Sequence, residues 1–311
     1  MRVNKIFFGL LLVLVGFAGK AQNQFHVTQY MTHHPLINPG AVGAFENLNG
    51  ALFYRAQWVG FDGAPNVAGF NINSPIGNGN SNVGLTLVND RIGVNNTTDV
   101  SGNYAYSIQT SLKTKLSFGL SATLRMNQSN YADVETNGVV DPSFQANSPT
   151  LLMPNFKFGT YFNSRKYYIG FAIPNLLHNE IVNNGGYSGK TTFDFSQMHF
   201  YLHGGYKFEI NPKFDLNVST LLKQVAGAPL QSDLNVLAEY MRKFGLGFSY
   251  RTSNEIAALA QFRINDMFKL GYSYDYTLNN LGNYSSGSHE IMFVFDIKSN
   301  AEEPVIEAPR F

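Results

Sequence analysis

Apolar and polar residues alternate along most of the chain, in segments of roughly ten residues, the length at which a tilted strand crosses a bilayer. In segment 115–126 the even positions carry Leu, Phe, Leu, Ala, Leu and Met, whereas the odd positions carry Lys, Ser, Gly, Ser, Thr and Arg. The same split recurs at 213–219, 244–251 and 268–276. Because successive side chains of a strand point to opposite faces, the pattern predicts β-strands with one apolar face and one polar face.

Fourteen segments of this kind follow one another, and turn residues separate them. The predicted strands cover residues 48–58, 66–74, 82–90, 97–109, 114–127, 153–163, 166–173, 195–210, 213–223, 230–240, 244–252, 255–264, 267–277 and 287–297.

The connections between these strands alternate in length. The longer ones cover 127–152, 174–194, 278–286, 59–65, 91–96 and 224–229. Between them lie short turns, at Ser164-Arg165, Asn211-Pro212, Arg242-Lys243 and Asn265-Asp266. Transmembrane barrels show this asymmetry, with short periplasmic turns and longer external loops. We therefore predict an all-β protein whose residues 48–297 form an antiparallel outer-membrane β-barrel of about 14 strands.

Composition supports a barrel over the other classes of protein. Charged residues make up 14% of the chain, against roughly 25% in ordinary soluble proteins, and aromatic residues also make up 14%. A soluble β-sandwich would carry more charged residues on its solvent face, whereas the polar face here consists mostly of Gly, Ser, Asn and Thr. The mean hydropathy of −0.13 is too low for a bundle of membrane helices. A net charge of +1 without a long charge run predicts no nucleic-acid partner, and the absence of Cys excludes disulfides.

The first 21 residues predict a secretory signal peptide. Arg2 and Lys5 precede an apolar run at 6–19, which is too short for a bilayer-spanning helix. Gly19 and Ala21 then supply the small residues of a cleavage site, so residues 1–21 are expected to be removed.

Two further segments flank the predicted barrel. Segment 22–47 alternates weakly and contains Pro35 and Pro39, so we expect an irregular segment that either enters the barrel or lies in the periplasm. An even number of strands returns the tail, 298–311, to the periplasm. Its Glu302-Glu303-Pro304 sequence favours a disordered end.

The sequence shows no catalytic signature, whether G-x-S-x-G, H-E-x-x-H or a P-loop. His26, His33 and His34 make a metal site conceivable, but no nearby Cys or Asp completes a ligand set. Polar residues of a docked segment are the simpler interpretation. Asp62 and Asp90 lie at the outer ends of predicted strands, where turn capping explains them. We expect no enzymatic activity, no metal and no cofactor.

Aromatic residues gather near the ends of predicted strands. Such residues form interfacial girdles in membrane proteins, although simple lipid-facing bulk is the alternative. We expect a girdle position for Trp58 in particular. The set comprises Tyr54, Trp58, Tyr131, Tyr161, Tyr167, Tyr168, Tyr272, Tyr274 and Tyr276.

Short motifs occur in a fixed order over the first part of the chain. They are Gln29-Tyr30-Met31, Pro35, Asn38-Pro39, Gly43, Tyr54-Arg55-Ala56-Gln57-Trp58, Asp62-Gly63-Ala64-Pro65, Ser74-Pro75, Asn82-Val83-Gly84-Leu85, Asn89-Asp90-Arg91-Ile92-Gly93, Tyr104-Ala105-Tyr106 and, near the end, Ser288-His289-Glu290-Ile291. This ordered set resembles the PorP/SprF family. The match is dense over 24–125 and thin over 127–290. One departure is Gly40-Ala41-Val42, where the family usually has Ala-Tyr-Ala.

The resemblance implies a function as well as a fold. Proteins of this family are outer-membrane barrels of the type IX secretion system of Bacteroidota, and they associate with periplasmic machinery. Some support the export or surface attachment of large adhesins linked to gliding, often with a type B C-terminal domain. We accordingly expect as partners the periplasmic components of that system, a secreted adhesin or type B C-terminal-domain protein, and outer-membrane lipid. The motif residues expected to bind partners are Gln29, Tyr30, Met31, Asn38, Pro39, Arg55, Gln57, Trp58, Asp62, Pro65 and Asp90.

Three functions remain open on the sequence. The first is an interaction protein, with external contacts at 127–152 and 174–194 and a lumenal or periplasmic contact at 22–47. The second is a passive or substrate-specific diffusion channel, which the Gly, Ser and Asn of the polar face favour. The third and weakest is an outer-membrane hydrolase, because the sequence shows no spacing of Ser, His and acidic residues that suggests a catalytic triad.

Overall fold

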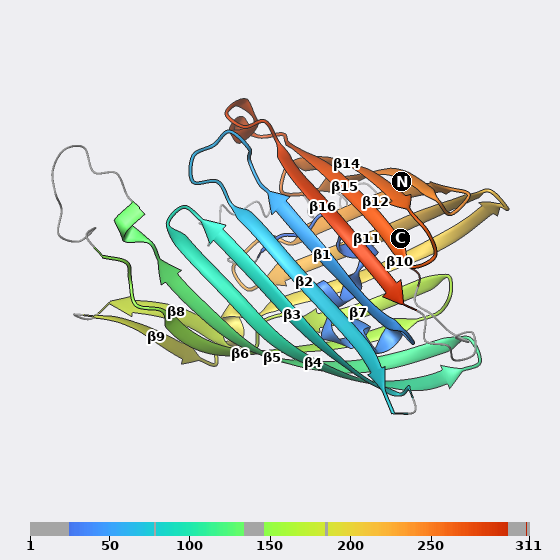
Figure 1. The fold of residues 1–311 in the computed structure, drawn as a ribbon, viewed down its shortest axis with the longest axis horizontal. Helices are drawn as coiled ribbons and strands as arrows, with labels where there is room; N and C mark the ends of the chain where they lie inside the picture. The colour runs from blue at the N-terminus through green and yellow to red at the C-terminus, as the bar shows by residue number, and fades with distance from the viewer. Residues whose placement is uncertain (1–24, 78, 134–145, 184–185, 298–308, 310–311) are drawn as a thin grey trace, which may run out of the picture.

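The computed structural model describes residues 25–77, 79–133, 146–183, 186–297 and 309 (Figure 1). The predicted signal peptide, 1–21, lies outside the described residues, as does nearly all of the tail. Fourteen strands close into one antiparallel barrel, which confirms the predicted fold class. Within the described part of the chain, none of the helices has the length and apolar character needed to cross a membrane.

The strands that form the barrel match the predicted segments closely. They are β1 Leu48–Ala56, β2 Asn66–Ile76, β3 Ser81–Ile92, β4 Asn95–Ser111, β5 Thr114–Ser129, β6 Leu151–Asn163, β7 Tyr167–Ile173, β10 His199–Asn211, β11 Phe214–Val225, β12 Gln231–Tyr240, β13 Phe244–Arg251, β14 Glu255–Arg263, β15 Phe268–Thr277 and β16 Ser288–Ile297.

The first and last strands close the barrel. β1 pairs with β16 from Leu48 opposite Ile297 to Ala56 opposite His289. Consecutive barrel strands are hydrogen-bonded neighbours, and β7 pairs directly with β10. Closure gives every strand of the barrel a hydrogen-bonded neighbour on each side, as a sheet in hydrocarbon requires.

The two faces of the wall divide as the alternation predicts. Leu120 points outward and is 58% exposed, whereas its neighbours on the inner face, Ser117 and Ser121, are buried. The same holds for the outward Leu246 and the inward Ser249 of β13. The barrel therefore has an apolar outer wall and a largely polar inner wall, as lipid outside and a hydrated or filled lumen demand.

Connections of different length lie at the two ends. At the long-loop end, the connections cover 57–65, 93–94, 130–150, 174–198, 226–230, 252–254 and 278–287. At the short-turn end, they cover 77–80, 112–113, 164–166, 212–213, 241–243 and 264–267.

Two predicted connections differ from the structure. The predicted loop 174–194 contains a separate hairpin of β8, His178–Asn183, and β9, Tyr187–Thr192. Both strands are short and polar, so alternation did not reveal them. The predicted connection 91–96 is wrong: β3 and β4 extend into it and leave a two-residue turn, in which Gly93 has φ +56°. Glycine adopts this left-handed conformation without strain, as hairpin turns require.

Residues 25–47, here called the lumen segment, lie inside the barrel (Figure 1, blue). The segment contains three short 3-10 helices, η1 Tyr30–Thr32, η2 His34–Leu36 and η3 Pro39–Ala44. Proline near the start of η2 and of η3 fixes φ and lacks an N–H, which suits the first position of a helix. Such short turns leave many backbone groups without internal partners, so the wall must supply them.

We expect an arginine on the outer wall to be costly only at mid-depth. Leu120→Arg lies midway along β5, and its charge would face hydrocarbon, so unfolding free energy should fall by about 2–4 kcal/mol. Leu112→Arg, in the β4–β5 turn, should cost less than about 1 kcal/mol. Urea titration of both variants in lipid vesicles measures the difference. Equal losses of unfolding free energy would contradict the assignment of this face to lipid.

Candidate functional site

The lumen segment runs through the barrel from one end to the other. Its start, Phe25 and His26, lines a 240 Å³ cavity at the long-loop end, together with Trp58 of the β1–β2 loop. At the short-turn end, Glu46 forms an ion pair of 2.8 Å with Lys115 of β5. Two further cavities, of 240 Å³ and 40 Å³, also include Phe25 and lie in the long-loop half.

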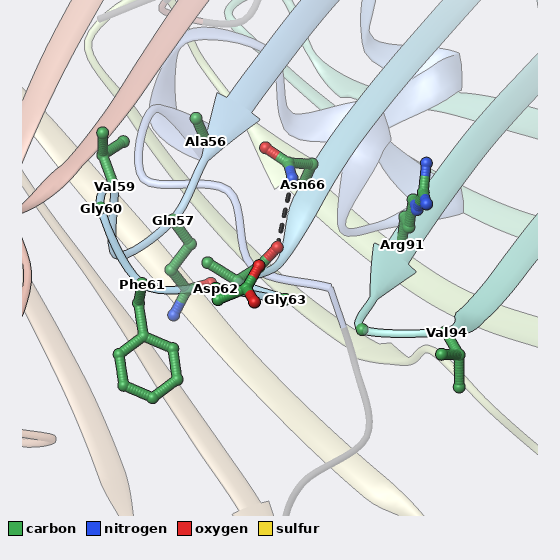
Figure 2. A pocket seen from close by; sticks show the side chains of 12 residues that line it. Ala56, Gln57, Val59, Gly60, Phe61, Asp62, Gly63, Asn66, Arg91 and Val94 are labelled. Carbon is green, nitrogen blue, oxygen red and sulfur yellow. Dashed lines mark hydrogen bonds between the residues drawn. The ribbon is translucent and has the colours of Figure 1, made fainter. Parts of the chain in front are cut away.

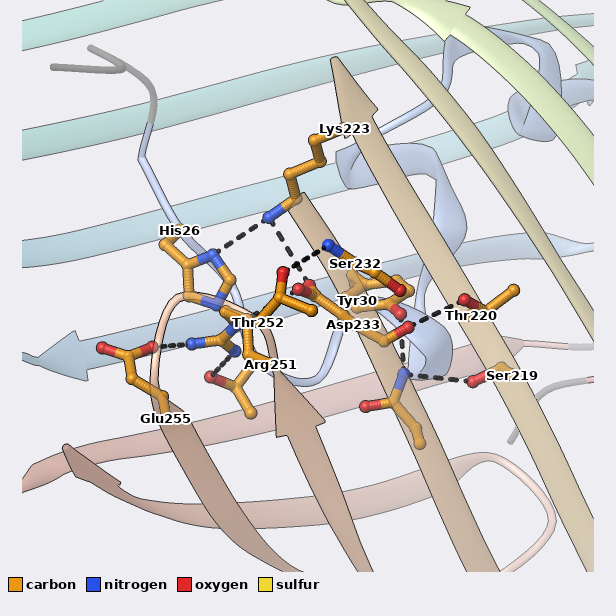
Figure 3. Close-up of polar contacts among 12 residues, drawn as sticks. His26, Tyr30, Ser219, Thr220, Lys223, Ser232, Asp233, Arg251, Thr252 and Glu255 are labelled. Carbon is orange, nitrogen blue, oxygen red and sulfur yellow. Dashed lines mark hydrogen bonds and ion pairs between the residues drawn. The ribbon is translucent and has the colours of Figure 1, made fainter. Parts of the chain in front are cut away.

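A group of buried charges on the inner wall holds the start of this segment (Figure 3). In it, Arg55 Nη2 lies 2.8 Å from Asp275 Oδ2, and Arg251 lies 3.3 Å from Asp233 Oδ1 and also pairs with Glu255. Burying charges without partners is expensive, so such a group persists only when cations and carboxylates satisfy one another. This ion cluster consists of Arg55, Lys223, Asp233, Arg251, Glu255, Asp275 and Glu290.

The ion cluster binds the backbone of Thr28 and Gln29. Glu290 accepts the Thr28 N–H at 2.7 Å and the Gln29 N–H at 2.9 Å, one with each carboxylate oxygen. The Thr28 hydroxyl donates to Asp275 at 2.6 Å and accepts from Arg55 at 2.8 Å. Hydrogen bonds to ionised partners are stronger than neutral ones, so these four bonds make the main polar attachment of the segment.

His26 and Tyr30 flank Thr28 and Gln29 along the chain, and Figure 3 shows their side chains near Lys223, Asp233 and Arg251. Lys223 Nζ lies 3.2 Å from His26 Nδ1, and Asn235 Nδ2 donates to the Tyr30 hydroxyl at 2.6 Å. An ammonium group only donates hydrogen bonds, so His26 Nδ1 accepts from the lysine.

Asn38 fixes the middle of the segment. Its side-chain amide donates to the Thr160 carbonyl at 3.0 Å and bonds His203 Nε2 at 2.9 Å. Its oxygen accepts the Gly40 N–H at 2.8 Å, which starts η3. One side chain thus caps a helix and joins the segment to β6 and β10.

Glycines of the wall let the segment approach closely. A Cβ at Gly119 would collide with the Pro39 and Gly40 backbone, and one at Gly159 would collide with Asn38. At Gly271 it would collide with the Gln29 side chain. These strand positions therefore admit the segment because they lack side chains.

His34 packs among aromatic rings of the wall. Its ring centroid lies 4.2 Å from that of Tyr168 and 5.6 Å from those of Tyr161 and His203. Tyr161 and Tyr168 are thus buried in the lumen, so neither the girdle nor the lipid-facing interpretation holds for them. They sit on inward positions of β6 and β7, where the segment supplies their packing. No group of three metal-ligating side chains occurs among the residues that the structure describes.

The loop 57–65, here called the rim loop, forms an ordered part of the long-loop end. Val59 exchanges backbone hydrogen bonds with Ser286 and Gly287 of the β15–β16 loop, at 2.7 Å and 2.8 Å. Gly63 O accepts the Gly93 N–H at 2.9 Å. The loop lines a depression of 930 Å³, together with Arg91 of β3. Figure 2 shows the lining side chains, with Arg91 across from the loop.

Trp58 has a strained position in this loop. Its φ is +49°, which bulky residues rarely adopt, and its side chain lines the lumenal cavity beside His26. Its buried indole N–H has no acceptor among the described residues. The predicted girdle position is therefore wrong for Trp58. Strain of this kind persists where the surroundings impose it, often at functional sites.

The structure separates the predicted partner-binding residues into three groups. Gln29, Tyr30, Met31, Asn38, Pro39 and Arg55 are buried between the lumen segment and the wall. Gln57, Trp58, Asp62 and Pro65 belong to the rim loop. Asp90 lies apart, lining a cavity with Asp99 and Arg125, which bond each other at 2.7 and 2.8 Å.

Sequence reasoning missed most of the ion cluster. Glu290 of β16 lies in the closing motif 288–291, but the other carboxylates lie on β12, β14 and β15, outside the motifs. One signal was available: charges at inward positions of a chain with few charges are expensive unless paired, so Asp233, Arg251, Asp275 and Glu290 were candidates for one buried group.

These features define a class of protein: a 14-strand transmembrane barrel with an N-terminal segment of its own chain inside. A family model described as type IX secretion system membrane protein PorP/SprF matches residues 19–295. The chain therefore belongs to the PorP/SprF family of type IX secretion system membrane proteins, and it is an outer-membrane protein.

Comparison with solved structures supports the fold. The monoaromatic hydrocarbon channel CymD superposes with a TM-score of 0.51 at 9% identity, covering 90% of this chain and 96% of that one. The toluene transporter TbuX of Ralstonia pickettii gives 0.52 at 10% identity, covering 86% and 93%. At such identity the likeness shows the barrel fold alone. A search of curated proteins finds no match.

We expect Glu290→Gln to loosen the lumen segment. An amide retains one acceptor oxygen for two backbone N–H groups and leaves Arg55 less paired, so docking should weaken by roughly 3–5 kcal/mol. Glu209→Gln, which breaks an exposed pair with Lys166, should cost less than about 1 kcal/mol. Hydrogen exchange at the Thr28 and Gln29 amides reports the effect. Unchanged protection in Glu290→Gln would refute the attachment.

We also expect two matched Gly→Ala variants to change the free energy of unfolding differently. Gly159→Ala forces a methyl group against Asn38 and should destabilise the protein by about 1–3 kcal/mol. Gly102→Ala adds a methyl group with no atom within 4 Å and should be neutral or stabilise by up to about 1 kcal/mol. Urea unfolding measures both variants. A Gly159→Ala variant as stable as the wild-type protein would exclude close packing at this position.

Proposed function

We propose that this protein is a closed, non-enzymatic barrel that couples or anchors secreted surface proteins to the type IX secretion machinery. The observation that carries the proposal is the lumen segment: buried charges and a glycine-lined wall hold it inside the barrel. With its lumen occupied, the protein offers partners its two ends rather than a passage.

The lengths of the connections supply the orientation. Outer-membrane barrels place short turns in the periplasm and long loops outside. On this orientation the short-turn end faces the periplasmic components of the secretion system, and the long-loop end faces the cell exterior.

The long-loop end has the features of a protein-binding surface. Exposed aromatic side chains stand on three of its connections: Phe61 on the rim loop, Phe193 and Phe195 after β9, and Tyr284 before β16. Aromatic residues on an otherwise polar surface commonly anchor protein partners. We assign this end to a secreted adhesin, of the gliding type or with a type B C-terminal domain.

The predicted binding residues take different roles in this proposal. Gln57, Trp58, Asp62 and Pro65 shape the rim loop and so form or support the external contact. Gln29, Tyr30, Met31, Asn38, Pro39 and Arg55 act by holding the lumen segment, since a partner would reach them only after the segment moved.

A diffusion channel is the second candidate. The barrel fold shared with a hydrocarbon channel and a toluene transporter favours it, as do the lumenal cavities near Phe25. Transport would require the segment to leave or to shift, against the bonds of the ion cluster. The family and fold are not those of known enzymes, so we do not favour a hydrolase.

Gene deletion with complementation tests the proposed function. In the deletion strain we expect the partner adhesin to move from the cell surface to the medium. Wild-type protein and Leu112→Ser, at the short-turn end, should restore surface attachment. Phe61→Asp, on the rim loop, should restore it poorly, because it places a charge on the external apolar surface. Fractionation of cells and medium measures the adhesin. An adhesin that stays at the surface without the gene would overturn the proposal.

A further inference from the structure

Positive charge is concentrated at the short-turn end. Four neighbouring turns carry it, because β4 to β7 and β10 to β13 follow one another around the barrel. The cations in these turns are Lys113, Arg165, Lys166, Lys213, Arg242 and Lys243. Near them, the exposed acidic residues among those described are Glu209 and Asp266. This end therefore attracts anions.

Two of these turns enclose a groove of 630 Å³. Lys113 of the β4–β5 turn lines one side, and Arg165 and Lys166 of the β6–β7 turn line the other. Lys166 forms an ion pair of 2.6 Å with Glu209. Within the described part of the chain, Lys113 and Arg165 form no ion pair, so two positive charges remain available at the mouth of the groove.

The rest of the groove is apolar and belongs to the outer wall. Tyr167 of β7 and Tyr206 of β10 are register partners, and their rings stack at 6.5 Å with an interplanar angle of 6°. Leu112, in the β4–β5 turn, is 83% exposed. The groove thus continues from charged turns onto the wall that faces lipid.

We propose that this groove binds an anionic phospholipid of the periplasmic leaflet. Its phosphate lies between Lys113 and Arg165, and its acyl chains lie along Tyr167 and Tyr206. The inference uses the orientation given under the proposed function, and it does not depend on adhesin attachment.

The apolar wall is the reason for choosing a lipid as occupant. Aromatic residues at the membrane interface pack against lipid, and basic pockets beside the bilayer bind anionic head groups. An acidic segment of a periplasmic protein would match the charges, but it would have to enter the bilayer region to cover Tyr167 and Tyr206.

Lipid titration of the purified full-length protein in detergent tests the proposal, with native mass spectrometry as readout. We expect tighter binding of phosphatidylglycerol than of phosphatidylethanolamine. The double variant Lys113→Ala/Arg165→Ala should lose phosphatidylglycerol affinity about 25-fold, because each cation near a membrane surface contributes about fivefold. A matched control, Arg91→Ala/Lys190→Ala, removes two cations at the long-loop end, away from the groove, and should change affinity less than about twofold.

Several results would overturn the inference. These are equal affinity for the two lipids, an equal loss in both double variants, or inorganic phosphate that displaces phosphatidylglycerol completely at millimolar concentration. Loss of a periplasmic partner from Lys113→Ala/Arg165→Ala, with lipid affinity unchanged, would assign the groove to that partner instead. The titration contains no secretion partner, and we expect this variant to keep the adhesin at the cell surface. A failed lipid result is therefore distinguishable from a failed function.

Discussion

The structure depends on the hydrogen bonds between the Glu290 carboxylate and the backbone of Thr28 and Gln29. A lumen formed by 14 strands is too wide for wall side chains to fill, and an irregular segment inside it needs partners for its backbone. Glu290 satisfies two adjacent N–H groups, while Arg55 balances its charge. The barrel and its segment therefore stabilise each other, and neither is complete alone.

Attaching a segment through buried charges costs free energy, so their presence here suggests a role beyond stability. An apolar lumen would hold an apolar segment at lower cost, but in many registers. Ion pairs and a carboxylate directed at particular N–H groups favour one position of the chain. The glycine at position 159 and Asn38 act in the same direction, because a shift of one residue would bring a side chain against the wall. We infer that the position of the segment, rather than the stability of the protein alone, explains this arrangement.

The alternation of side chains was sufficient to predict the barrel, its strand number and the inner and outer faces, because lipid and lumen impose opposite demands on adjacent residues. It was not sufficient for β8 and β9, which form a separate hairpin and are not part of the barrel wall, so they meet no such demand. The Asn-Gly pair at 184–185 was the local hairpin signal. The candidate site was predicted in part: the motifs indicated Asn38 and Arg55, but not that both are buried. Contacts between strands far apart in sequence, such as that of Arg55 with Asp275, have no local signature.

Occupation of the lumen is the central claim, and single-channel recording in planar bilayers tests it most directly. Full-length protein should show no steady conductance, whereas a variant lacking residues 25–46 and shown to assemble as a barrel should form open pores. Steady conductance of the full-length protein, equal to that of the shortened variant, would contradict this account.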